Sequence, residues 1–161
     1  MLGRFVKVGT FCPDSASRHL WLRLRDGMDD LKKVSHLLYA PGEVMPGIEM
    51  SLAEARARGS AAALHDEVPF CVVRDWIWID LIVPDAIRET LQASGQQPAM
   101  VYAGRVLYDS ANRFQEGDWV RTTQLIEFAD GCIFRTRNTR YVLAGPGARK
   151  SAELTTVLKI F

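Results

Sequence analysis

The chain has 161 residues, of which 48% are hydrophobic and 24% charged, and its formal net charge at pH 7 is +1. This composition is that of one globular domain, and the near-neutral charge excludes a chain-wide attraction to nucleic acid or to anionic lipid. No stretch approaches the ~20 apolar residues that a membrane span needs, and Cys12, Cys71 and Cys132 form neither a metal-binding Cys pair nor a disulfide framework. We therefore expect a cytoplasmic protein without cofactor, metal or membrane contact.

The first 50 residues are expected to form a partly helical extension. Residues 5–11 favour a short strand, and residues 15–26 fit a strand and a helix equally well. Two aspartates precede apolar residues at helical spacing, which predicts a helix over residues 29–38. The segment 41–50 contains two Pro-Gly pairs and is expected to be a loop.

A second helix is predicted over residues 52–65. Ser51 and Glu54 form a capping-box pattern, in which each side chain bonds the backbone N–H of the other residue. Gly59 interrupts the alanine-rich sequence that follows, and Pro69 ends the helical region.

A long strand is predicted over residues 71–83, because apolar residues alternate there with larger polar and aromatic ones. Asp75 is the single charge on the apolar side of this strand. We expect it to form an ion pair with Arg74 or with Arg105 of a neighbouring strand, since an unpaired buried carboxylate is costly.

The rest of the chain predicts one more helix, at 85–94, and strands at 100–108, 119–128, 132–144 and 153–160. Because helices come mainly first and strands mainly later, we expect an α+β fold in which N-terminal helices pack on a mainly antiparallel sheet of about five strands. Residues 1–161 would form one domain, with residues 1–50 as the extension and residues 51–161 as the core.

The Asp130-Gly131 pair predicts a hairpin turn. A three-residue loop with a left-handed Gly131 pairs Phe128 with Cys132 and Ile126 with Phe134, which gathers the apolar side chains on one face. A two-residue loop would mix apolar and charged side chains on each face.

This register puts arginines on the opposite face of the hairpin. Arg135 and Arg137 would lie beside Arg121, with Glu127 diagonal to Arg135. Such a face is either an anion-binding surface or the solvated side of an antiparallel sheet. The candidate interaction residues of this face and of the turn after it are Arg121, Arg135, Arg137, Asn138, Arg140, Arg149 and Lys150.

Several other motifs favour structural roles. The stretch Gly145–Ser151 resembles a phosphate-binding loop, but Arg149 stands in place of its second glycine, so we expect a sharp turn. Cys71 lies in an apolar strand without a hydrolase signature around it. Trp76 and Trp78 would share one strand face, which favours core packing over a dimer interface or the stacking of nucleobases.

Three runs of sequence carry a resemblance to a known family. They are Cys71-Val72-Val73-Arg74-Asp75-Trp76-Ile77, Gly117-Asp118-Trp119-Val120-Arg121-Thr122, and Thr136-Arg137-Asn138-Thr139 with Tyr141-Val142-Leu143 and Gly145-Pro146-Gly147. Together they resemble a family of uncharacterised small proteins of pseudomonads, related bacteria and their mobile elements, a domain of unknown function, over roughly residues 50–161. The resemblance implies a compact bacterial protein with an accessory role, and it implies no catalytic residue.

Three functions follow as hypotheses. We expect a non-enzymatic interaction protein that docks an acidic protein surface or a nucleic-acid backbone through the candidate arginines, in the setting of bacterium–mobile-element conflict that the resemblance implies. The first alternative is a small enzyme or ligand-binding domain that holds a phosphate or carboxylate with Arg121, Arg137 and Asn138, with Asp75 or His65 as a base. The second alternative is a homo-oligomer joined through the Trp76 and Trp78 face or a strand edge.

Overall fold

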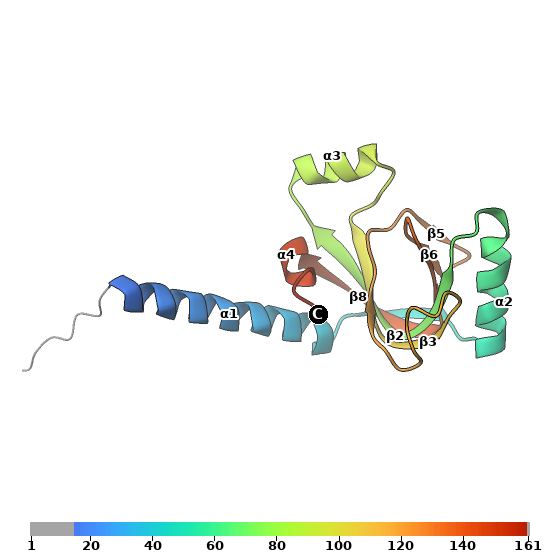
Figure 1. Cartoon of the computed structure of the whole chain (residues 1–161), viewed down its shortest axis with the longest axis horizontal. Coiled ribbons are helices and arrows are strands. Elements are labelled where there is room, and N and C mark those ends of the chain that lie inside the picture. The colour runs from blue at the N-terminus through green and yellow to red at the C-terminus, as the bar shows by residue number, and fades with distance from the viewer. Residues whose placement is uncertain (1–14, 161) are drawn as a thin grey trace, which may run out of the picture.

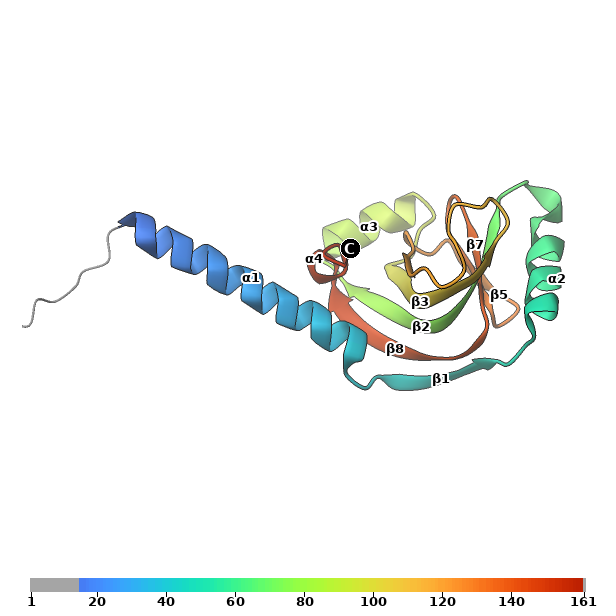
Figure 2. The ribbon, with the colours of Figure 1, turned by 60° about the horizontal axis from the view of Figure 1, so that its bottom comes forward.

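A curled mixed sheet forms the body of the molecule, and a long helix projects from one side of it (Figure 1, Figure 2). The computed structural model describes residues 15–160, so the strand expected at residues 5–11 lies outside the described residues. Within this range the helices are α1 (Ser15–Tyr39), α2 (Leu52–Ala62), α3 (Asp85–Ala93) and α4 (Leu154–Val157), with a 3₁₀ turn, η1 (Ala63–His65). The strands are β1 (Glu43–Ile48), β2 (Phe70–Ile82), β3 (Ala99–Asp109), β4 (Val120–Arg121), β5 (Glu127–Ala129), β6 (Ile133–Arg135), β7 (Arg140–Leu143) and β8 (Gly145–Glu153).

Strand β2 is the centre of the sheet. It pairs with β3 in antiparallel orientation along one edge, and along the other edge it pairs in parallel first with β7 and then with β8. Its 13 residues are enough to pair with two successive strands on the same side. The α+β class is therefore confirmed, but the sheet of the described residues has eight strands and is mixed, rather than about five and mainly antiparallel.

The segment between β4 and β5 closes the sheet on itself. The N–H of Leu125 donates to the carbonyl of Ala99 on β3 at 2.9 Å, and the N–H of Ile126 donates to the carbonyl of Arg135 on β6 at 2.8 Å. The chain thus crosses from one sheet edge to another within two residues. The single strand expected over 119–128 is wrong for this reason, because β4 pairs with β3 and β5 pairs with β6.

The interior of the curled sheet holds the main core. Trp76 and Trp78 are 3% and 8% exposed, and the rings of Trp78 and Phe134 meet edge to face with centroids 5.1 Å apart. Core packing of the two tryptophans is confirmed, and they offer no exposed face to a second molecule. Two further apolar clusters lie on the outside of the sheet, one against α1 and α4 and one against α2.

Strand β2 reverses its faces at Asp75, which the sequence pattern did not predict. Cys71 and Val73 share the interior cluster with Trp76 and Trp78, so the alternation of side chains is broken between them. Asp75 adopts a left-handed backbone conformation with φ 55°, and its side chain is exposed. The expected ion pair of Asp75 is confirmed with Arg105, whose Nε lies 3.3 Å from the carboxylate.

Strand β1 occupies the segment that the sequence favoured as a loop. It pairs with β8 in antiparallel orientation, with an irregularity between Met45 and Ile48 where Gly47 has φ 59°. Proline is tolerated here because β1 lies at the edge of the sheet, where Pro46 needs no N–H for a ladder. The Pro-Gly pair therefore marks an irregular edge strand rather than a turn.

The hairpin around Gly131 forms in a register different from both that were considered. Glu127 lies opposite Arg135 and Phe128 opposite Phe134, and the loop of Asp130, Gly131 and Cys132 has left-handed conformations at its first two residues. The expected left-handed Gly131 is confirmed, and the pairing of Phe128 with Cys132 is wrong. The register places Phe128 against Trp78, with centroids 5.1 Å apart.

Three expectations for the C-terminal part are also corrected. The stretch 132–144 contains two antiparallel strands, because Thr136 and Thr139 bond each other and turn the chain between β6 and β7. Gly145, Pro146 and Gly147 begin strand β8 instead of forming a turn. Residues 154–157 are helical, so no strand runs over 153–160.

The predicted helices at 52–65 and 85–94 are confirmed, with α2 continued by η1. The capping box is present, since the Ser51 hydroxyl accepts from the N–H of Glu54 at 3.2 Å and the Glu54 carboxylate accepts from the N–H of Ser51 at 2.7 Å. The helix expected over 29–38 is part of α1, which also includes the ambiguous residues 15–26.

Candidate functional site

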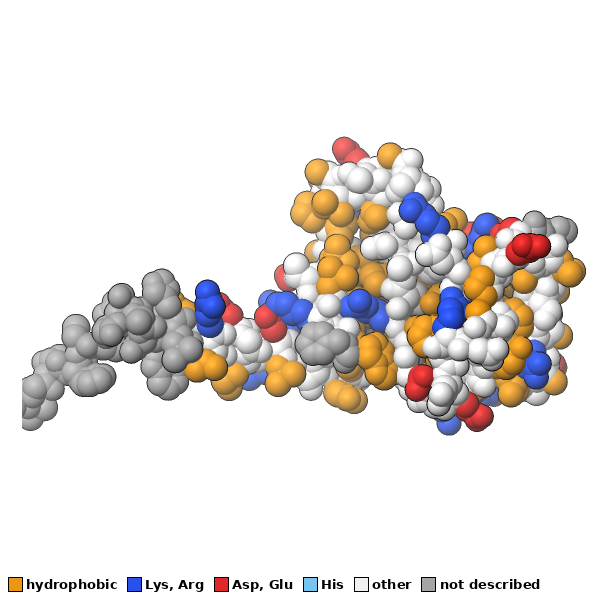
Figure 3. All heavy atoms as spheres, viewed as in Figure 1, with side chains coloured by type: hydrophobic (Ala, Val, Ile, Leu, Met, Phe, Trp, Pro, Cys, Tyr) orange, Lys and Arg blue, Asp and Glu red, His pale blue; other side chains and the backbone are white. Residues whose placement is uncertain are grey.

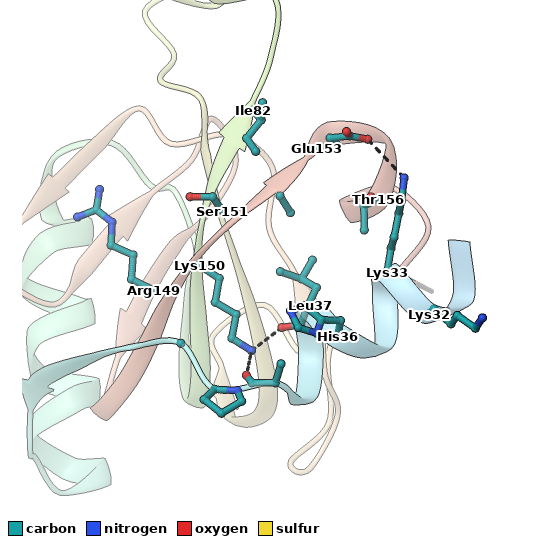
Figure 4. A pocket seen from close by; sticks show the side chains of 14 residues that line it. Lys32, Lys33, His36, Leu37, Ile82, Arg149, Lys150, Ser151, Glu153 and Thr156 are labelled. Carbon is teal, nitrogen blue, oxygen red and sulfur yellow. Dashed lines mark hydrogen bonds and ion pairs between the residues drawn. The ribbon is translucent and has the colours of Figure 1, made fainter. Parts of the chain in front are cut away.

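A basic cleft opens between the C-terminal half of α1 and strand β8 (Figure 4). Its volume is about 750 Å³, and Leu37, Ile82 and Ala152 contribute apolar lining. The basic residues that line it are Lys32, Lys33, His36, Arg149 and Lys150. Two of the sequence-predicted residues, Arg149 and Lys150, are thus brought together with three residues of α1.

Lys150 joins the two walls of the cleft. Its ammonium donates to the carbonyl oxygen of Leu37 at 2.6 Å and to that of Ala40, so it satisfies carbonyl groups at the C-terminal end of α1 (Figure 4). Burial lowers the pKa of Lys150 from its ordinary value. The side chain therefore fixes where α1 leaves the sheet.

Arg149 lies at the edge of the cleft, and its side chain points away from α1 (Figure 4), where a two-pronged contact holds it. Its Nε and Nη2 donate to the carboxylate of Asp80 at 2.7 and 3.0 Å, and its guanidinium lies 5.8 Å from the centre of the Trp78 ring. The indole N–H of Trp78 donates to the same carboxylate at 3.1 Å. The position of Arg149 is thereby set by the core of the sheet.

The rim of the cleft carries the accessible cations. Lys33 lies 3.9 Å from Glu153, whereas Lys32 and His36 are exposed and form no ion pair with any residue of 15–160. Three lysines and one carboxylate, that of Glu153, line the cleft beside the neutralised pair of Arg149 and Asp80, so its net charge is about +2. This grouping could not be predicted from the sequence, because the approach of α1 to β8 depends on tertiary structure.

Arg135 and Arg140 share one carboxylate. Arg135 Nη2 donates to Asp66 at 3.0 Å, and Arg140, whose side chain is buried, donates to Asp66 and to the carbonyl of Val68 at 3.3 Å. The hydrogen bond from Arg140 holds the pKa of Asp66 below its usual range. Glu127 lies 3.7 Å from Arg135, directly opposite rather than diagonal to it. These contacts tie the start of β2 to β6 and β7.

Arg121 has a different role from that expected for it. It lies on β4, which pairs with β3 and not with the strand that carries Arg135. Its Nη1 donates to the carbonyls of Val157 at 2.9 Å and Ile160 at 3.0 Å, which caps the C-terminal end of α4.

Arg137 and Asn138 are exposed at the tip of the turn between β6 and β7. The seven predicted residues therefore occupy four separate places: the α4 cap, the Asp66 cluster, this turn and the cleft. The hypothesis of one continuous arginine face gains no support from these positions.

A buried ion pair that sequence reasoning missed joins Asp109 to Arg113. The Asp109 side chain is fully buried and accepts Nη2 of Arg113 at 2.7 Å, while Nη1 of Arg113 donates to Thr139 at 2.7 Å. Burial raises the pKa of Asp109, but the hydrogen bonds from Arg113 outweigh it and hold the pKa below its usual value. The only sequence signal is an Arg four residues after an Asp at a strand end.

The groups suited to catalysis are poorly placed for it. Cys71 is buried in the interior of the sheet, and burial raises the pKa of its thiol to about 12, so it is protonated at neutral pH. Asp75 is exposed and paired with Arg105. Among residues 15–160, no group of three His, Cys, Asp or Glu side chains is arranged to hold a metal ion.

No helix in the described part of the chain is long and apolar enough to cross a membrane. Neither curated proteins nor solved structures contain a match to the chain. One family model does match, over residues 46–159, a range that begins within β1, ends after α4 and leaves out α1. The chain therefore belongs to the family of the domain of unknown function DUF6957.

Proposed function

We propose that the protein is a non-enzymatic interaction protein that docks an acidic segment of another protein in the cleft between α1 and β8. The observation that carries this proposal is the combination of exposed Lys32 and His36 with an apolar floor in one cleft of about 750 Å³. Cationic groups attract and orient an acidic partner, and the apolar floor supplies surface to bury when that partner binds.

An acidic protein segment suits this cleft better than a nucleic-acid backbone. A nucleic-acid surface neutralises many phosphates along an extended row of cations. Here Arg149 is already paired with Asp80, and Lys150 is occupied by carbonyl groups of α1. The net charge of +1 adds no general attraction.

The setting of this interaction is part of the proposal. The family resemblance supports an accessory role in conflict between a bacterium and a mobile element. A cytoplasmic location is supported by the free, buried thiols of Cys71 and Cys132.

The test compares variants at the rim of the cleft with a variant at the turn between β6 and β7. Proteins would be captured from nuclease-treated lysate of the native host with the wild type, with Lys32→Glu/His36→Glu, and with Arg137→Glu as the matched control. The side chains of Lys32, His36 and Arg137 are exposed and form no hydrogen bond or ion pair with the described residues, so the variants are expected to fold.

We expect the cleft variant to lose an acidic partner that the wild type and Arg137→Glu retain, because the two carboxylates introduced at the rim repel it. Retention of every partner by the cleft variant would show that the cleft is not the docking site. Loss of the partner in Arg137→Glu alone would show that the docking site is the turn between β6 and β7.

A further inference from the structure

Helix α1 exposes an apolar stripe on the part that projects from the sheet. Leu24, Met28 and Leu31 are 53%, 61% and 71% exposed and follow the i, i+4, i+7 spacing of one helix face. Apolar atoms are visible along one edge of the described part of α1 in Figure 3. Among the α1 side chains whose burial is described, those of residues 22–39, only that of Leu37, near the C-terminal end, is buried against the body of the molecule.

The stripe runs into an apolar groove beside α4. This groove has a volume of about 470 Å³ and is lined by Gly27, Leu31, Val34, Leu38 and Ile160. Nothing in the described structure lies within 4 Å of the position that a Cβ of Gly27 would take. The groove can therefore accept another helix at close approach, as glycine allows at helix crossings.

The charges beside the groove identify the helix that fits it. Arg23 and Asp30 are seven residues apart, so they lie on the same flank of α1, two turns from each other. Asp30 pairs with Lys159, and Arg23 forms no ion pair within residues 15–160. When a second α1 is laid antiparallel in the groove, Arg23 of each copy meets Asp30 of the other, and Leu24 of each copy faces Gly27 of the other.

We propose that two copies of this chain form a dimer in which their α1 helices pair antiparallel along this groove. The arrangement is self-complementary about a two-fold axis, as closed dimers require. It buries the exposed stripe and provides two interchain ion pairs. The basic cleft lies on another side of α1, at Lys33 and His36, so the dimer leaves it open and does not depend on the proposed docking function.

Sedimentation equilibrium on the full chain tests the dimer. We expect a mass of twice 18.1 kDa for the wild type, and a dissociation constant raised by at least about 100-fold in Leu24→Glu, because an unpaired carboxylate would be buried. Leu22→Glu is the matched control, since Leu22 is also exposed, at 47%, but lies two residues from Leu24 and hence on the other side of the helix.

Charge reversal tests the antiparallel orientation. Arg23→Glu and Asp30→Lys should each weaken the dimer, because each creates two like-charge contacts, and the double variant should restore it. In a parallel pair Arg23 of one copy lies about two turns from Asp30 of the other, so neither single reversal would create a like-charge contact between them. A wild type that stays at 18.1 kDa at about 100 μM overturns the proposal, and so does a dimer that survives Leu24→Glu or fails to respond to the reversals.

Discussion

Two carboxylates, Asp66 and Asp80, hold three arginine side chains within the fold. Asp66 receives two of the predicted arginines and Asp80 receives a third. A single sequence shows which residues are cationic, but not which carboxylate or carbonyl group lies within reach of each. Exposure after folding, as at Lys32 and Arg137, is the better guide to a binding role.

The buried Asp109 should contribute strongly to stability. We expect Asp109→Asn to lower the free energy of unfolding at pH 7 by about 2–3 kcal/mol, because it removes charge-assisted hydrogen bonds from Arg113. Asp75→Asn is the control, since its pair with Arg105 is exposed and contributes under about 1 kcal/mol. Urea unfolding measures both, and equal losses in the two variants would contradict this role for Asp109.

The effect of Asp109 should depend on pH in a defined direction. Its pKa is lower in the folded protein than the ~3.9 of an unfolded chain. Its stabilising contribution is therefore complete above about pH 4 and is lost as the pH falls through the folded pKa. Urea unfolding at a series of pH values below about 4 should show the difference between the wild type and Asp109→Asn shrinking as the pH falls, and an undiminished difference would contradict the ion-pair explanation.

At the scale of the elements, glycines mark contacts between helices and sheet. Gly59 lowers the helix propensity of α2. It is buried, however, at the place where the helix contacts Phe70 on β2. An added Cβ would lie 2.2 Å from Cδ2 of Phe70. The glycine is thus required by packing rather than by helix propensity.

Gly59→Ala should destabilise the protein although alanine favours helices. We expect a net loss of about 1–3 kcal/mol, because overpacking against the Phe70 ring outweighs a gain of about 1 kcal/mol in helix propensity. Ser60→Ala, at the next and exposed position of α2, should have little effect or a stabilising one. Thermal unfolding compares the two, and a higher midpoint for Gly59→Ala than for the wild type would rule out the close contact.

Elements with strong local signals could be predicted from the sequence. The capping box begins α2, alternating apolar residues mark β2, and a left-handed Gly95 ends α3. The pairing of strands could not be predicted, because the period of side chains is the same whichever strand lies alongside. The face reversal at Asp75 and the crossing at Leu125 are likewise set by closure of the sheet, and the cleft depends on how α1 meets β8.

At the scale of the whole molecule, two observations separate α1 from the rest of the chain. The family match covers residues 46–159 and leaves out α1, and α1 packs only loosely on the sheet. The sheet with α2 to α4 has its own interior core, whereas most of α1 lies outside it (Figure 2). Stability should therefore be uneven along the chain.

Amide hydrogen exchange should reveal this division in the Leu24→Glu variant, which is expected to be monomeric. We expect amides of residues 22–31 to exchange orders of magnitude faster than those of Val72 and Val101, because the projecting helix buries little surface and opens alone. Protection of residues 22–31 equal to that of the core would show that α1 does not open separately.

The antiparallel pairing of β1 with β8 determines how the molecule would respond to mechanical load. Glu43, where the chain arrives from α1, lies opposite Arg149, so the first half of β8 pairs with β1 and the second half leads on towards α4. Tension applied through these two helices would open the hydrogen bonds of the pair one after another instead of straining them together. The edge strand would peel away at low force, while β2 and β3 stay closed around the tryptophans.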